Sequence, residues 1–419
     1  MEHRQPSDTA EEQRTSEEVE EVEDNVTDAA VDFVSLGMLI IDDIEYLPPR
    51  PPVRDVLGGA GAYAALGARL FSPAPRLSRS IGWVVDQGSD FPAAMRAQID
   101  GWQTAVVLRE DAGRLTTRGW NGYDVGERRA FRYTTPKVRL TAADLPPPLL
   151  RARSVHIVSS AGRCRELVAD LLTRRRQLKA SGARPYIVWE PVPDRCSPDE
   201  LLDCTNTLPV VDVCSPNHAE LAAYMGDPDG GLDPASGRPS AAAVERACEQ
   251  LLAAMPLQSY AIVVRAAELG CYNLHGGLRP DIDMEALFAG LQQDDEGAIA
   301  REEIEVDPGL EIWVPAVFGT SDKDDDDNTP RTSPVVDPTG GGNAFMGAMA
   351  LALARGHGLE QAAVWGNVAA SFAIQQVGVA VLGRDPDGRE TWNGERVDDR
   401  CTAYETRLRQ NGLLRGDRR

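Results

Sequence analysis

Apolar and polar residues follow two different patterns along this chain, and the change comes near residue 154. Before it, the segments 104–109, 114–120 and 129–133 are short and roughly alternating. A period of two predicts antiparallel strands with one face in solvent. We therefore expect these segments to contribute to a small β sheet.

From residue 154 onward, apolar runs alternate with helical patterns. The expected strands are residues 155–158, 186–189, 210–214 and 261–264, and the helices between them include residues 165–180, 218–225 and 242–255. Buried strands that alternate with helices are typical of a parallel, doubly wound sheet with helices on both faces. The expected fold class is therefore α/β.

The segment between residues 31 and 70 contains three distinct patterns. Residues 31–41 form a strand-like apolar run, where the folded part of the chain is expected to begin. Four prolines within residues 47–52 exclude a central strand there, because proline donates no ladder hydrogen bond. Residues 60–70 are rich in small side chains and predict a helix that packs closely on its neighbours.

Acidic residues give the chain a net charge of −22 and are concentrated in two stretches. Residues 1–30 hold eleven acids and two bases, and we expect this tail to be disordered. Residues 321–334 are expected to be a mobile, solvated loop, an interpretation we favour over a divalent-ion site. The overall acidity argues against a nucleic-acid partner, because binding to that backbone requires a basic face.

The chain shows no signal for a membrane, for secretion or for zinc. No apolar stretch approaches the roughly 20 residues that span a bilayer, and the acidic N-terminus does not resemble a secretory signal, so a cytoplasmic location is expected.

Seven scattered cysteines without C-x-x-C spacing predict reduced thiols. His156, in an apolar run, is expected to be a core imidazole. The basic end of the chain after residue 402 is expected to fray.

The most informative segment is residues 335–347. Two β-branched residues lead into Gly340, Gly341 and Gly342, and an apolar helical pattern follows. A glycine-rich turn at a helix start exposes unpaired N–H groups, and the helix dipole adds partial positive charge, so an anion such as a phosphate is favoured. Asn343 begins the helix and is expected to face whatever the glycines hold.

Several motifs together resemble one family. The DPTGGGN run is similar to the DTxGAGD signature of the PfkB carbohydrate kinases, which include ribokinase and adenosine kinase. Gly37 with Asp42 resembles the family's first strand, and residues 58–70 resemble its GGxxxNxA signature. Residues 82–91 resemble its GxVGxDxFG turn, and Asn217 with Glu220 matches its NxxE motif. The motifs stand in the family's order between residues 32 and 383. The DPTGGGN spelling is most similar to the fungal killer-virus-maintenance (MAK) branch.

The resemblance implies a ribokinase-like domain over residues 31–395, with a lid from residues 44–57 and 104–135. The insertion 321–334 has no family counterpart, and residues 396–419 are expected to be a C-terminal tail. The resemblance further implies ATP and Mg²⁺ as cofactors, a small sugar or nucleoside as the phosphate acceptor, and a homodimer formed through the lid.

The resemblance also implies roles for individual residues. Gly340, Gly341 and Gly342 would form an anion hole, and Asn217 and Glu220 would organise Mg²⁺ through water. Asp42 would accept hydrogen bonds from substrate hydroxyls, and Gly58, Gly59 and Tyr63 would also line the substrate. Thr339 and Arg265 would contact the nucleotide.

Three positions depart from the family pattern. The catalytic base of the family aligns with Asn343, and an amide cannot take a proton near neutral pH, a loss that typically costs about 10²- to 10⁴-fold in rate. Tyr63 stands where the pattern has a substrate-binding Asn. Arg265, in the turn that replaces T-L-G-x-x-G, is compatible with a phosphate contact and equally with a surface position. Two hypotheses follow: a slow kinase, or a catalytically silent protein that binds nucleotide or sugar and acts through a partner.

One alternative concerns Gly58, Gly59 and Gly61, which with Ala64 also fit the dinucleotide fingerprint G-x-G-x-x-A. That interpretation requires a good strand just before the first glycine. Residues 53–57 follow the prolines and are a poor candidate, so the kinase interpretation is preferred.

Overall fold

The computed structural model describes residues 30–123, 129–180, 183–253, 260–275, 309–319 and 334–414. The expected disordered tail lies outside these ranges except for residue 30, and the acidic insertion lies outside them except for residue 334.

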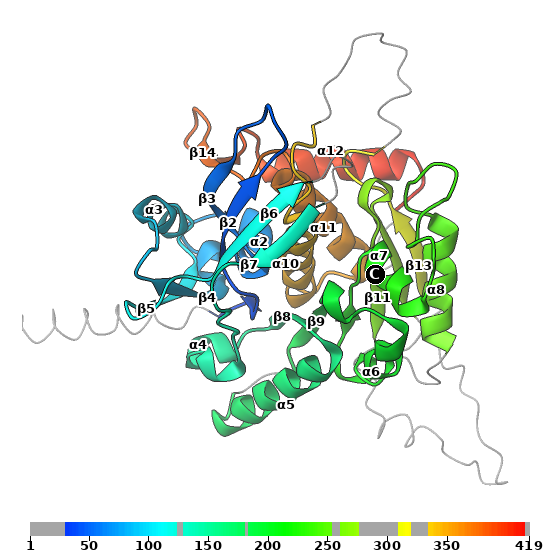
Figure 1. Ribbon diagram of the computed structural model, residues 1–419, viewed down its shortest axis with the longest axis horizontal. Helices are drawn as coiled ribbons and strands as arrows, with labels where there is room; N and C mark the ends of the chain where they lie inside the picture. Colours follow the sequence, from blue (N-terminus) through cyan, green and yellow to red (C-terminus); the bar gives the residue numbers. More distant parts are fainter. Residues whose placement is uncertain are drawn as a thin grey trace, which may run out of the picture.

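A nine-stranded sheet forms the centre of the molecule (Figure 1), in the order β13-β12-β11-β10-β9-β8-β1-β4-β5. The strands are β1 (Phe33–Ser35), β4 (Ile81–Gly88), β5 (Ala105–Asp111), β8 (Ser154–Ser159), β9 (Tyr186–Pro191), β10 (Val213–Cys214), β11 (Ala261–Arg265), β12 (Cys271–His275) and β13 (Leu310–Val314). The strands from β5 to β11 run parallel. The chain steps outward from β1 in both directions, so the strand order reverses between β1 and β8, where such sheets bind ligands at their carboxyl edge.

Two strands at one edge are antiparallel. β12 pairs with β11 and with β13, and the pairing of β12 with β13 begins at His275 opposite Leu310 and continues without a shift in register. The mixed edge leaves the parallel part of the sheet unchanged.

Helices cover both faces of this sheet over two separate hydrophobic clusters. One face carries α2 (Ala60–Leu70), α3 (Ala93–Gly101), α10 (Gly341–Ala354), α11 (Leu359–Ala373) and α12 (Val397–Gln410). The other carries α4 (Pro147–Leu150), α5 (Ala161–Gln177), α6 (Leu201–Thr205), α7 (His218–Met225) and α8 (Ala241–Ala253), drawn mainly in green in Figure 1. The expected doubly wound α/β fold is confirmed. Within the described residues, no helix is both long and apolar enough to cross a membrane.

A second sheet has the order β3-β2-β6-β7 and consists of β2 (Ile40–Glu45), β3 (Val53–Gly58), β6 (Arg118–Tyr123) and β7 (Arg129–Tyr133). It matches the expected small sheet with two corrections. Residues 105–111 belong to the large sheet as the parallel edge strand β5, and β6 pairs parallel to β2. Residues 53–58 do form a strand after the prolines, but in the small sheet, so the dinucleotide arrangement is absent there.

The apolar run 31–41 is two strands rather than one, because the chain leaves the large sheet after Ser35 and enters the small sheet at Ile40. Gly37 lies in the connection, and a Cβ atom there would stand 2.6 Å from the backbone nitrogen of Gly61. The close approach fixes where the chain crosses from one sheet to the other.

The C-terminal segment differs from the expected tail, because residues 397–410 form α12 and pack on the core. Tyr404 and Leu408 are 3% and 2% exposed, and the amide of Asn367 in α11 donates to the hydroxyl of Tyr404 at 3.0 Å. The apolar residues of α12 are one helical turn apart and lie among charged residues, so one face of the helix is buried. A short hairpin of β14 (Leu382–Arg384) and β15 (Glu390–Trp392) precedes this helix.

Two glycines let α2 and α10 cross in close contact. A Cβ atom on Gly67 would lie 1.9 Å from the carbonyl oxygen of Ala344, and one on Gly347 would lie 1.9 Å from the carbonyl oxygen of Ala64. No side chain fits between the backbones at either point, which explains the small residues of segment 60–70.

We predict that Gly67→Ala lowers the free energy of unfolding, because the added methyl group overlaps backbone that cannot rotate away; overpacking typically costs about 1–3 kcal/mol. The matched control is Gly101→Ala in α3, where a Cβ atom meets nothing within 4 Å, and where the gain in helix propensity is the only change. Urea denaturation of both variants measures the difference. Equal stabilities would contradict the close crossing.

Candidate active site

The carboxyl ends of the parallel strands meet the start of α10 beside the reversal in strand order. β9 and β11 contribute Glu190 and Arg265 at this edge, α10 contributes Asn343, and His156 lies further inside the sheet, in the middle of β8. Glu190 lies in the middle of the group, bonded to the other three. This is the location at which doubly wound sheets bind ligands.

Each glycine at the start of α10 is packed against a different element. Gly340 has φ +81° and lies against the ring of Tyr63, where a Cβ atom would stand 2.2 Å from the nearest ring carbon. A Cβ atom on Gly341 would stand 2.7 Å from Ile374, and one on Gly342 would stand 2.2 Å from Nη1 of Arg265. Packing therefore leaves little room for a side chain at these positions, and the positive φ of Gly340 adds a backbone reason for glycine.

Tyr63 and Thr339 support this turn from the inside. Tyr63 is 2% exposed, so its ring serves as a platform for the glycine loop. The backbone N–H of Thr339 donates to Oδ1 of Asp337 at 2.9 Å, which closes a small turn before the glycines. Oδ2 of the buried Asp337 has no hydrogen-bond partner among the described residues.

Asn217 and Glu220 form a capping box at the start of α7. The side chain of Asn217 accepts from the N–H of Glu220 at 2.8 Å, and Glu220 accepts from the N–H of Asn217 at 2.8 Å. The N-x-x-E spacing therefore has a local structural function. Burial raises the pKa of Glu220 to about 7, and the nearby Arg265 opposes that rise.

Arg265 is a buried cation at the centre of the edge and not a surface residue. Its side chain is 12% exposed, with Nη1 2.9 Å from Glu190 and Nη2 3.4 Å from Glu220. Nη2 also donates to the carbonyl oxygen of Ser215 at 2.9 Å. Its buried Nε has no partner among the described residues, and its Nη1 is the atom nearest to Gly342.

Glu190 was not singled out from the sequence, although it links most of the site. Its Oε2 accepts from Nδ2 of Asn343 at 2.6 Å and lies 3.4 Å from Nε2 of His156. Burial alone would raise the pKa of Glu190, but Arg265, His156 and Asn343 together lower it below its usual range. An acid at the carboxyl end of a buried strand is the one local signal that could have identified it. His156 is fully buried, as expected of a core imidazole.

The arrangement does not fit direct coordination of Mg²⁺ by Glu220. The Glu220 carboxylate is used by the capping box and by Arg265, whose guanidinium lies between the two acids. Over the described ranges, no group of three or more His, Cys, Asp or Glu residues could hold a metal ion. The expected water-mediated role of Glu220 stays a prediction.

Asp42 lies in the small sheet with the two glycines that the motif places beside it. It is 4% exposed, and Nδ2 of Asn121 donates to its Oδ1 at 3.0 Å. A Cβ atom on Gly58 would stand 2.1 Å from its Oδ2, so that glycine makes room for the carboxylate. Gly59 has φ +86° and a backbone too close to Met38 for any side chain.

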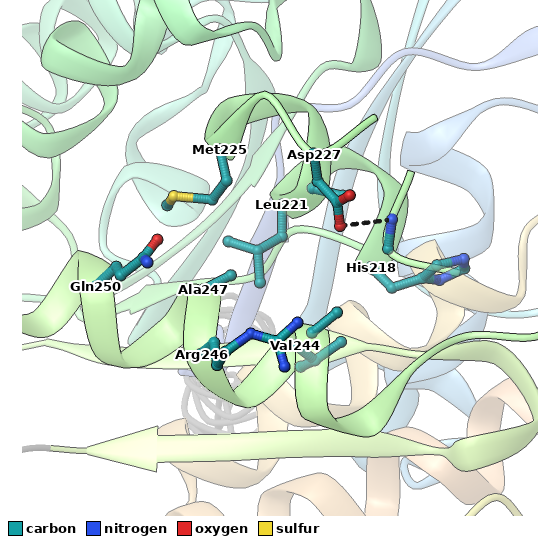
Figure 2. A pocket seen from close by; sticks show the side chains of 11 residues that line it. His218, Leu221, Met225, Asp227, Val244, Arg246, Ala247 and Gln250 are labelled. Atoms are coloured by element: carbon teal, nitrogen blue, oxygen red, sulfur yellow. Dashed lines mark hydrogen bonds between the residues drawn. The ribbon is translucent and has the colours of Figure 1, made fainter. Parts of the chain in front are cut away.

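A separate cavity of about 150 Å³ lies between α7 and α8. Leu221 and Met225 line it from one helix, and Val244 and Ala247 from the other (Figure 2). None of the predicted site residues contributes to its wall. The cavity therefore does not belong to the glycine loop or to the Glu190 group.

The sequence is similar to a known family and to two curated proteins. Residues 318–383 match the family model described as pfkB family carbohydrate kinase. An uncharacterised protein of Schizosaccharomyces pombe is 31% identical over 375 residues, covering 89% of this chain and 92% of that protein. Protein MAK32 of Saccharomyces cerevisiae is 30% identical over 401 residues, covering 93% of this chain and 96% of MAK32.

Solved structures with the same fold include ribokinases. The ribokinase of Giardia lamblia is 14% identical, with a TM-score of 0.56, and the match covers 90% of this chain and 99% of that one. Arabidopsis thaliana ribokinase, solved with ribose and ATP, is 16% identical with a TM-score of 0.50, covering 84% and 94%. At these identities the likeness shows the fold, which is ribokinase-like.

The raised pKa of Glu220 predicts a pH dependence of stability. Between its ordinary value of 4.5 and about 7, the folded protein binds a proton that the unfolded chain has lost. Stability therefore falls as the pH rises through this window and is level above it, by a few kcal/mol at most, since one pKa unit corresponds to ~1.4 kcal/mol.

The variant Glu220→Gln keeps the capping box and removes the titration, so its melting temperature should change less than that of the wild type between pH 5 and pH 8. Differential scanning fluorimetry at several pH values measures this. The control Glu166→Gln, at an exposed position of α5, should follow the wild-type curve. An unchanged pH dependence in Glu220→Gln would show that other groups carry it.

Proposed function

Because the chain belongs to the PfkB family of carbohydrate kinases, in the branch that contains MAK32, we propose that it transfers the γ-phosphoryl group of ATP to a hydroxyl of a small sugar or nucleoside. The observation that carries the proposal is the helix start at Gly340, Gly341 and Gly342. It faces Arg265 at the carboxyl edge of a ribokinase-like sheet.

The glycine loop supports binding of the transferring phosphoryl group. Phosphoryl transfer is accelerated mainly by positioning and by stabilising charge on the equatorial oxygens. The loop brings the positive end of the α10 dipole to this place before any ligand arrives, and such preorganised charge is effective in catalysis. The N–H of Gly341 already donates to the carbonyl oxygen of Pro338 at 3.3 Å, so this donor would have to exchange that bond for a phosphate oxygen. Arg265 adds a permanent positive charge beside Gly342, and its buried Nε has no partner among the described residues.

The small sheet supports binding of the acceptor. Asp42 is an ionisable acid in a nearly closed environment, and a carboxylate accepts hydrogen bonds from hydroxyls when ionised. Arabidopsis ribokinase, whose fold this chain shares, was solved with ribose and ATP, which makes a sugar and ATP the first ligands to test. A lid movement of the small sheet, a lid-mediated homodimer and a cytoplasmic location stay predictions.

A second candidate function is that of a silent protein that binds nucleotide or sugar and acts through a partner. Asn343 favours it, because an amide at the position of the family's base accepts no proton. Arg265 also favours it, because its guanidinium lies against Gly342 and is held there by two acids. Ligand binding without turnover distinguishes this candidate from the kinase.

We predict that ATP raises the melting temperature of the wild type and that Gly341→Val abolishes the rise. A branched side chain at this position overlaps Ile374 and displaces the turn that would hold the phosphates. The matched control is Gly358→Val at the start of α11, where no atom lies within 4 Å of the added Cβ. A persistent ATP shift in folded Gly341→Val would place the nucleotide elsewhere.

We further predict substrate-dependent ADP release from Mg·ATP with at least one member of a panel of sugars and nucleosides. Asp42→Asn should keep the ATP-induced thermal shift and lose roughly 10- to 100-fold in kcat/KM for that acceptor, since hydrogen bonds to a charged group contribute about 1.5–3 kcal/mol. Equal values for wild type and variant would assign Asp42 a structural role. ATP binding without turnover on any acceptor would favour the silent protein.

A further inference from the structure

Asn343 contacts a carboxylate that its own motif does not contain. Its Nδ2 donates to Oε2 of Glu190 at 2.6 Å, although 152 residues separate the two positions in the sequence (191–342). The Glu190 side chain is 9% exposed and lies at the end of β9, beneath the start of α10. An acid is therefore present at the expected place of the base, but it comes from the sheet and not from the helix.

All described partners of Glu190 stabilise its ionised form. Arg265 approaches Oε1 at 2.9 Å, while Asn343 and His156 approach Oε2 at 2.6 Å and 3.4 Å. An ionised carboxylate offers about four lone-pair sites, and these three partners use three of them. One site on Oε1 remains, on the oxygen that Arg265 contacts through Nη1, and Nη1 is also the Arg265 atom nearest to Gly342.

A chain of hydrogen bonds through the sheet orients this carboxylate. The N–H of Gly37 donates to Oγ of Ser35 at 3.0 Å, and that oxygen lies 3.1 Å from Nδ1 of His156. If the hydroxyl of Ser35 donates to Nδ1, the proton of the imidazole is on Nε2, where it points to Glu190. We assign this tautomer because a carboxylate only accepts.

We propose that Glu190 is the proton acceptor for the phosphoryl-transfer step, in the role that Asn343 cannot perform. The inference rests on the proposed kinase function. The acceptor hydroxyl loses its proton to Oε1 of Glu190, and its oxygen forms a bond to the γ-phosphorus of ATP. The bond from that phosphorus to the β,γ-bridging oxygen breaks, and ADP leaves with the bonding electrons.

The same geometry explains the amide at position 343. A carboxylate there would face Glu190 at hydrogen-bond distance, and two like charges so close cannot both stay ionised. The amide supplies a donor instead. Compared with the family pattern, the base is therefore on the strand, at Glu190, and the helix supplies a hydrogen-bond donor, Asn343. The pair carries a single negative charge.

A double-mutant cycle tests this exchange with the full chain. Glu190→Gln should lower kcat by about 10²- to 10⁴-fold while the ATP-induced thermal shift is retained. Asn343→Asp alone should lower both kcat and the melting temperature at pH 7.5. The double variant Glu190→Gln with Asn343→Asp restores one acid and one amide, and it should recover most of the lost kcat.

The acidic limb of the kcat–pH profile adds a readout that a structural role would not move. The pKa that this limb reports should shift in the double variant. Its acid is at position 343, whereas Arg265 contacts the acid at position 190 in the wild type. The control Glu390→Gln removes another Arg-paired carboxylate, 2.8 Å from buried Arg69 at the far end of α2. It should lower the melting temperature and leave kcat unchanged.

Three results would overturn the assignment in distinguishable ways. Wild-type kcat in folded Glu190→Gln would show that Glu190 takes no proton. An Asn343→Asp variant that is more active than the wild type would show that the site lacks a base and that the helix position is the right one for it. Silence of all four proteins with every acceptor, while ATP still raises their melting temperatures, would reject the kinase function and this inference with it.

Discussion

The close crossing of α2 and α10 sets the geometry of the whole molecule. Gly67 and Gly347 let the two backbones touch, and neither contact leaves room for a methyl group. α2 follows directly from the small sheet, and α10 begins with the glycine loop. The distance between the acceptor side and the phosphate side of the site therefore depends on a backbone contact, which is stiffer than one between long side chains.

A buried charge group is the second element of the site. Arg265 lies between Glu190 and Glu220, and each of these side chains is at most 12% exposed. Removing charges from water costs several kcal/mol per ion unless they are paired and hydrogen-bonded. The two pKa shifts run in opposite directions: the partners of Glu190 hold it ionised, while burial raises the pKa of Glu220 to about 7, so that Glu220 is only partly ionised near neutral pH.

Local motifs predicted the parts of the site that local chemistry determines. The helix 60–70 and the glycine turn at a helix start depend on residues within a few positions of one another and were predicted. The capping box of Asn217 and Glu220 is equally local, but its N-x-x-E spacing was interpreted only as a magnesium motif. Glu190 could not be predicted in the same way, because its partners are brought to it by the sheet order. The edge strand β5 and the helix α12 were assigned wrongly for a related reason: short apolar patterns do not reveal which sheet or face will bury them.

The pairing of His275 with Leu310 has a consequence for how this chain can vary in length. Antiparallel neighbours need only a two-residue turn between them, yet 34 residues (276–309) separate the ends of β12 and β13. Because His275 pairs with Ala261, the first residue of β11, the chain leaves and re-enters the sheet at the amino end of that strand. Both attachment points are therefore at the opposite end of β11 from Arg265, so a change in the number of residues between them is introduced away from the carboxyl edge.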